Sequence, residues 1–167
     1  LDDQMLLDAS TRRNLELIAS LRDGNRLHSL LWVLDHTCTA MGARLLKKWL
    51  LAPLLDIDAI TRRQDAVAAF REDDLLREKV RETLRNIHDL ERLLSRAASG
   101  AGNARDLAQL RDSLTVIPRL LATMEDASPV LKALVEGADT LDELRATLSD
   151  AIVDSPPISV RDGGMIR

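Results

Sequence analysis

Few residues of this chain have the types and the spacing that catalysis or metal binding requires. His36 and Cys38 lie two positions apart and could form one half of a zinc site. A zinc site needs about four ligands, however, and the chain contains one cysteine and three scattered histidines. We therefore expect structural roles for His36 and Cys38 and no bound metal.

The carboxylates that could serve as general acids or bases lie among arginines. Asp73 and Asp74 lie between Arg71 and Arg77, and Glu91 has a similar setting. Arginine neighbours make helix caps and surface ion pairs a better interpretation of these carboxylates than proton transfer. No pair of carboxylates is therefore assigned to catalysis.

One glycine-rich segment resembles the start of a phosphate-binding loop. Gly100 and Gly102 are separated by one residue, but no strand is predicted before them and the third glycine of such a loop is missing. The chain also lacks the glycine–lysine motif of a P-loop. The residues therefore predict no catalytic, cofactor or metal site, and we expect no enzymatic activity from this chain alone.

The composition is that of a folded domain that does not bind nucleic acid by itself. Of 167 residues, 46% are hydrophobic and 30% charged, the net charge is −4 and aromatic residues make up 2%. A negative balance with few aromatic rings disfavours phosphate binding and base stacking. The single cysteine, the lack of a long apolar run and the lack of a secretion signal predict a cytoplasmic location without a membrane span.

The segment at residues 27–53 has the strongest helical pattern, with apolar residues recurring at intervals of three and four. A break is predicted at residues 35–39, with Thr39 as the N-cap of a second helix that ends before Pro53. The two helices are expected to bury a broad apolar surface that other segments cover. Trp32 and Trp49 are predicted to be anchors of the core.

The remaining pattern predicts an all-α fold, a multi-helix bundle-like core. Helices are expected after Asp8 or Ser10 and after Asp56 or Asp58, the latter running to about Glu72. Pro118 should kink or shorten the helix that follows the loop at residues 99–103. Thr140 and Glu143 should form a capping box. The residues expected to face inward on these helices are Leu15, Ile18, Leu21, Ile60, Val67, Phe70, Leu76, Val80, Leu84, Ile87, Leu90, Leu93, Leu94, Ala97, Leu107, Leu110, Leu114, Ile117, Leu121, Leu141, Leu144, Leu148 and Ile152. The Ser128–Pro129 pair marks a further helix start.

The pattern changes at the carboxyl end. Ser155, Pro156 and Pro157 end the helix, and the alternation at residues 158–161 is typical of a strand. Residues 162–164 favour a hairpin turn, and residues 165–167 would begin the returning strand. We therefore expect residues 1–154 to form a helical core and residues 155–167 to begin a second segment that is cut short. The first residue, Leu1 instead of methionine, also suggests a piece of a larger protein.

Several motifs resemble the MutS family of DNA mismatch repair proteins. Residues 39–46 (TAMGARLL), followed by Trp49–Leu50 and Pro53–Leu54, are similar to a signature of its helical core. The matching stretches follow the family order along nearly the whole chain: residues 8–17 (DASTRRNLEL), 63–67 (RQDAV), 89–96 (DLERLLSR), 105–111 (RDLAQLR), 156–157 (PP) and 160–164 (VRDGG).

The resemblance implies that this chain is the first part of the helical core, or lever, domain up to the start of the clamp insertion. The parent protein would be a DNA-dependent ATPase that uses ATP and Mg²⁺ and binds mismatched duplex DNA as a homodimer in the bacterial cytoplasm. This segment would contact the connector, clamp and ATPase domains and couple the ATPase to the clamp mechanically. Pro118 and the loop at residues 99–103 are candidate flexure points. The alternative is a free-standing helical scaffold or adaptor for a protein partner.

Four residues near the predicted break are candidates for inter-domain contacts: Thr37, Thr39, Gly42 and Arg44. Each also has a local interpretation. Threonines cap helices, and a glycine in a helix permits close packing of another element. The sequence alone leaves both interpretations open for these residues.

Overall fold

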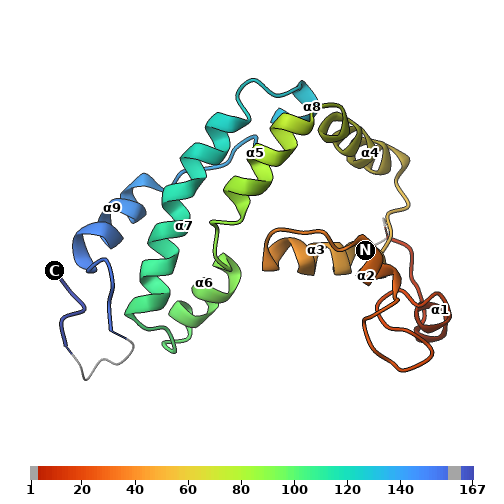
Figure 1. The fold of residues 1–167 in the computed structure, drawn as a ribbon, viewed down its shortest axis with the longest axis horizontal. Helices are drawn as coiled ribbons and strands as arrows, with labels where there is room; N and C mark the ends of the chain where they lie inside the picture. Colours follow the sequence, from red (N-terminus) through yellow and green to blue (C-terminus); the bar gives the residue numbers. More distant parts are fainter. Residues whose placement is uncertain (1–3, 158–162) are drawn as a thin grey trace. The chain divides into compact units, whose positions relative to one another are not determined.

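The computed structural model describes residues 4–157 and 163–167, and over these residues the protein is all-α (Figure 1). Its helices are α1 (Ala9–Asn14), α2 (Leu30–Leu34), α3 (Ala40–Leu51), α4 (Ile57–Glu72), α5 (Asp74–Leu84), α6 (Leu90–Ala98), α7 (Ala104–Thr123), α8 (Pro129–Lys132) and α9 (Asp142–Ala151). Two isolated β-bridges are the strand-like pairings of this part of the chain. None of the described helices is long and apolar enough to cross a membrane. The chain divides into two compact units, Leu1–Ala68 and Ala69–Arg167.

Helix starts in the first unit follow the predicted caps. Asp8 accepts a hydrogen bond from the backbone N–H of Thr11 at 2.6 Å and starts α1. Asp56 does the same for Ala59 at 3.1 Å, at the start of α4. Each carboxylate satisfies an N–H group that the first helical turn leaves unpaired.

The helix that begins after Asp8 is shorter than predicted, because it ends before the apolar residues Leu15, Ile18 and Leu21 that were expected to lie on it. α1 ends at Asn14, and Glu16 then has a positive φ of 47°, which a continuing helix does not allow. Leu15 and Leu21, both expected to face inward, are exposed. The stripe at Leu15, Ile18 and Leu21 therefore does not form a helical face.

The break at residues 35–39 is confirmed, because α2 ends at Leu34 and α3 begins at Ala40. The expected burial of these two helices is wrong. Leu31 is the one buried apolar residue of α2, and α3 has none. Trp32 and Trp49 are 46% and 39% exposed, so they do not anchor a core. The apolar side of α2 and α3 is a surface in this structure.

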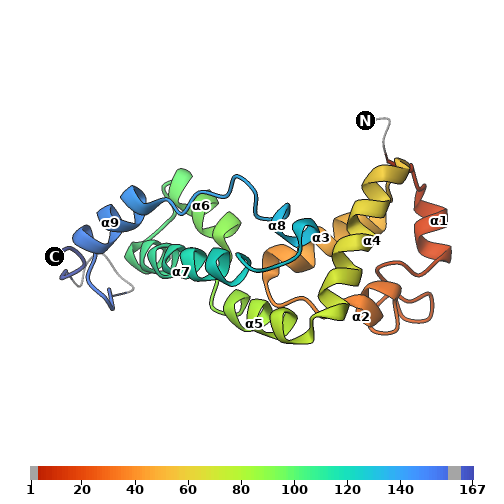
Figure 2. The same cartoon turned by 90° about the horizontal axis from the view of Figure 1, so that it is seen from above.

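In the second unit α7 packs against α5, α6 and α9 (Figures 1 and 2). The core forms along α7, whose Leu110 and Leu114 are buried together with Leu93 of α6 and Leu148 of α9. Apolar side chains buried in this way supply most of the stability of such a unit. Several residues predicted to face inward are instead exposed, Val67 in the first unit and Leu94, Ala97, Leu141 and Leu144 in the second.

Pro118 does not end its helix early. α7 continues through it to Thr123 and is 20 residues long. A proline inside a helix removes one N–H donor and crowds the preceding turn. Leu110, Leu114 and Ile117 pack against the core from one side of α7. They anchor the helical turns before Pro118, and this packing offsets the cost of the proline.

The capping box predicted at Thr140 and Glu143 does not form. α9 begins at Asp142, and its N-cap residue is Leu141, with a left-handed φ of 51° and no side-chain cap. The backbone N–H of Leu141 instead donates to the carboxylate of Asp139 at 2.9 Å. A local turn held by Asp139 therefore replaces the expected cap, and it carries Leu141 into an unfavourable conformation.

The predicted strand at Ile158 and Val160 lies outside the described residues. Gly163 and Gly164 have positive φ values of 66° and 65°, as the predicted turn residues require. The residues after Gly164 pair with the end of α9. Ile166 forms an antiparallel bridge with Ile152, at the end of α9.

Candidate functional site

The turn between α2 and α3 is held by a carboxylate. Asp35 accepts hydrogen bonds from the hydroxyl of Thr37 at 2.6 Å and from its backbone N–H at 3.1 Å, and it pairs with the guanidinium of Arg26. The bonds from Thr37, together with Arg26, hold the pKa of Asp35 below its usual value of 3.8. Asp35 is therefore ionised at neutral pH and serves as the centre of the turn.

The structure brings three of the four predicted contact residues together at this turn. The hydroxyl of Thr39 accepts a hydrogen bond from the backbone N–H of Gly42 at 3.0 Å and caps α3. A Cβ atom at Gly42 would lie 3.1 Å from that hydroxyl and 3.5 Å from Cβ of Thr37. The space beside Gly42 is thus filled by the threonines of its own turn. Arg44 is exposed on α3, next to this cluster in sequence.

The two tryptophans have polar or charged neighbours. The guanidinium carbon of Arg63 on α4 lies 3.7 Å from the centroid of the Trp49 ring, within the range of a cation–π interaction. His28 meets Trp32 edge to face, with ring centroids 5.3 Å apart. Both exposed rings thus have such a neighbour on the surface.

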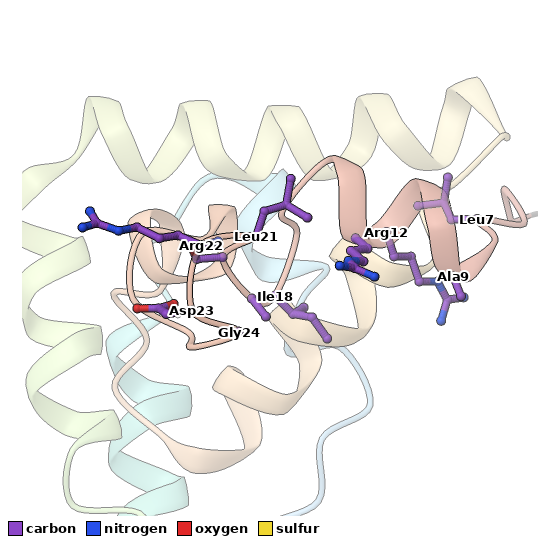
Figure 3. A pocket seen from close by; sticks show the side chains of 11 residues that line it. Leu7, Ala9, Arg12, Ile18, Leu21, Arg22, Asp23 and Gly24 are labelled. Carbon is purple, nitrogen blue, oxygen red and sulfur yellow. The ribbon is translucent and has the colours of Figure 1, made fainter.

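A hollow of about 730 Å³ lies between α1 and the following loop (Figure 3). Arg12, Arg13 and Arg22 are among its lining residues. Figure 3 shows Arg12 and Arg22 at different ends of the hollow, so their guanidinium groups do not converge on one point. Arg12 and Arg13 are both exposed.

Helix α7 is tied to α6 by a buried carboxylate. Asp106 accepts from Nε of Arg96 at 2.9 Å and from the backbone N–H of Asn103 at 3.0 Å, and Asn103 caps α7 in return. Burial raises the pKa of Asp106, but the bonds from Asn103 and Arg96 outweigh it and lower the pKa below 3.8. This capping box was not predicted, although asparagine with an acidic residue three positions on is a recognisable signal.

A second tie joins α7 to the segment between α5 and α6. The hydroxyl of Ser113, which is fully buried, accepts from the backbone N–H of His88 at 3.0 Å and donates to the carbonyl of Gln109 at 2.8 Å. Sequence offered no sign of this contact, because its partner is a backbone group 25 positions away.

A third tie joins α7 to the chain after α9. Arg111, 9% exposed, points its guanidinium at the backbone carbonyls of residues 152–154, with N···O distances of 3.4–3.5 Å. Arg105 donates from Nε to the carbonyl of Pro156 at 3.1 Å. Both arginines belong to the segment that resembles the MutS family, but their partners could not be read from it.

The loop at Gly100 and Gly102 is not arranged to bind phosphate. The N–H groups of Gly100 and Gly102 donate to the carbonyls of Ala97 and Arg96, at 3.1 and 2.8 Å, and are thus used to close α6. A loop that binds phosphate needs such N–H groups to point at the ligand. No group of three His, Cys, Asp or Glu side chains in the described part of the chain is placed to hold a metal ion.

Comparison with known proteins identifies the family. The family model described as MutS domain III matches residues 10–167. The chain is 50% identical over 168 residues to the DNA mismatch repair protein MutS of Thermosynechococcus vestitus, covering 100% of this chain and 19% of that protein. The corresponding MutS of Nostoc punctiforme is 51% identical over 167 residues, and that of Symbiobacterium thermophilum 48% identical over 166 residues, each alignment covering 99% of this chain.

The chain thus spans 19% of the length of the curated relatives that it matches. The family match over residues 10–167 includes the turn at α2–α3, all of α7 and the arginines that it carries. The chain belongs to the MutS domain III family.

Proposed function

We propose that this chain is the first part of the helical core of a DNA mismatch repair protein, and that it couples an ATPase domain to a DNA-gripping clamp. In this proposal residues 1–154 form the core and lever segment, and residues 155–167 begin the clamp insertion. The observation that carries the proposal is the family match over residues 10–167. The segment itself performs no chemistry in this role.

The second unit has the mechanical properties that such coupling needs. α7 is 20 residues long, or about 30 Å at 1.5 Å per residue. Ion pairs and hydrogen bonds through Asp106, Ser113 and Arg111 fasten three other segments to it. A helix tied in this way moves with its neighbours as one body, which supports the transfer of a displacement along its length.

The first unit supplies the proposed contacts to other domains. The apolar residues of α2 and α3, among them Trp32, Leu34 and Leu45, are exposed, and large exposed apolar surfaces mark interaction sites. We assign Thr37, Thr39, Gly42 and Arg44 to inter-domain contacts at the same place. The connector, clamp and ATPase domains of the longer protein are the proposed partners, and ATP and Mg²⁺ bind to that ATPase domain.

In this proposal the longer protein works as a homodimer on mismatched duplex DNA in the bacterial cytoplasm. The test uses the complete product of the gene, with duplexes that differ by one mismatched base pair. We expect tighter binding to the mismatched duplex, and an affinity that changes about tenfold when ATP and Mg²⁺ are added.

The contribution of this chain is tested with Arg96→Ala, which removes the tie between α6 and α7. We expect ATP hydrolysis without DNA and DNA binding without nucleotide to persist, while the effect of ATP on DNA affinity shrinks. Arg119→Ala, at an exposed arginine of α7, is the control. A gene product without ATPase activity or mismatch preference would contradict the proposal and favour a helical scaffold for a protein partner.

A further inference from the structure

Two short segments of the second unit pair with each other. We call residues 151–154 the outgoing segment and residues 165–167 the returning segment. Ile152 and Ile166 form an antiparallel bridge. The backbone N–H of Val153 donates to the carbonyl of Met165 at 3.2 Å, and that of Arg167 donates to the carbonyl of Ala151 at 3.1 Å. A pairing this short is marginal without support from other elements.

Arg111 of α7 provides such support on the outgoing segment. Its Nη1 donates to the carbonyls of Ile152 and Val153 at 3.4 and 3.5 Å, and its Nη2 donates to the carbonyl of Asp154 at 3.5 Å. The side chain of Arg111 is 10% exposed, so water competes little for these bonds. Three successive carbonyls therefore lie within reach of one guanidinium, whose shorter contacts, at 2.9 and 2.8 Å, are with the carboxylate of Asp112.

The carboxylate of Asp154 extends this contact to the returning segment. It lies 3.7 Å from Nη1 of Arg111 and 2.5 Å from Nη2 of Arg167. The two arginines thus share one carboxylate, one from α7 and one from the returning segment. Asp154 is 83% exposed, so this second link is weaker than the buried contacts of Arg111.

We propose that Arg111 is a positioning residue that fastens both paired segments, residues 151–154 and 165–167, to α7. It acts on the outgoing segment directly and on the returning segment through Asp154 and the bridge. The planar, forked guanidinium is required, because a lysine ammonium keeps the charge but cannot direct several fixed donors at successive carbonyls.

The inference deepens the proposed coupling function and rests on it for its consequence. If residues 155–167 begin the clamp insertion, Arg111 fastens the start of that insertion to the helix at the centre of the core. A displacement of α7 then reaches residues 151–154 and residues 165–167 together.

The test is amide hydrogen exchange, measured by NMR on the 167-residue chain. In Arg111→Lys we expect the amides of Val153 and Arg167 to exchange about tenfold faster, because their bridge loses its support. The amide of His88, bonded to Ser113 on α7, should keep its protection and so report that the unit remains folded. Arg119→Lys, at an exposed arginine of the same helix, should change none of these rates.

A second variant covers the case in which Arg111→Lys does not fold. Asp154→Ala alters only the exposed link, and we expect the amide of Arg167 to exchange about threefold faster with that of His88 unchanged. Unchanged rates in the folded variants would overturn the role of Arg111. Because these rates are read on this chain alone, that result would leave the coupling proposal intact. An unmutated complete protein whose DNA affinity does not respond to ATP would overturn the coupling proposal and leave the fastening by Arg111 intact.

Discussion

At the scale of single residues, Leu141 is one of three described residues other than glycine that have a positive φ. It has a φ of 51° directly before α9. For a residue with a Cβ atom this conformation costs about 1–2 kcal/mol, and its half-exposed side chain recovers little of that through burial.

Leu141→Gly should therefore stabilise the chain. Glycine adopts a positive φ without a steric penalty, and we expect the free energy of unfolding to rise by about 1 kcal/mol. Leu144→Gly is the matched control, because Leu144 is similarly exposed but lies inside α9. That change should lower the free energy of unfolding by about 1 kcal/mol. Urea unfolding measures both, and a destabilising Leu141→Gly would show that the leucine side chain matters more than its backbone.

At the scale of elements, helix starts were the best predicted features. Asp8 and Thr39 each cap the helix that they were expected to cap. A cap needs one side chain and an N–H group two or three residues away, so its signal is contained in a short stretch of sequence.

Burial was predicted less well. Val67 and Leu94 occupy positions on apolar stripes, yet both are exposed. Periodicity identifies the apolar side of a helix but not the segment that covers it. The contacts of Arg111 show the same limit, since their backbone partners lie 41–43 positions away and have no sequence signal of their own.

The tie between α6 and α7 predicts a dependence on pH. Asp106→Ala removes the ion pair to Arg96 and half of the capping box, and we expect a loss of about 1–2 kcal/mol in the free energy of unfolding at neutral pH. The pKa of Asp106 is lowered in the folded state, so its contribution is present above the unfolded value of 3.8 and is lost as the pH falls through the lower folded value.

The measurement is urea unfolding of Asp106→Ala and of the unchanged chain at neutral pH and at about pH 2. The difference between the two proteins should shrink at the acidic pH. Asp142→Ala removes an exposed ion pair with Arg145 and should cost less than about 0.5 kcal/mol. An equal loss from both variants would refute a special role for Asp106.

At the scale of the whole molecule, the two units differ in how much apolar surface they bury. The helices of the first unit contribute Leu31 and Ala66 to the buried residues, and Leu17 lies outside them. The second unit has a continuous core along α7. Because buried apolar area supplies most of the stability, the first unit should open more readily.

Denaturation followed by two probes tests this difference. Both tryptophans lie in the first unit and the chain has no tyrosine, so tryptophan emission reports that unit. We expect its midpoint at a lower urea concentration than that of far-UV circular dichroism, which follows all the helices. A tryptophan placed in the second unit by Ile117→Trp, with Trp32 and Trp49 changed to Phe, should follow the later transition. Coincident midpoints for all probes would indicate one cooperative unit.

The bridge between Ile152 and Ile166 also has a consequence for the chain between them. Since the chain leaves and returns at adjacent points, the length of chain between them has little effect on the ends. Each doubling of a flexible loop costs only about 0.6 kcal/mol of closure entropy. A longer stretch of chain between the two bridged residues would therefore cost the helices little closure entropy.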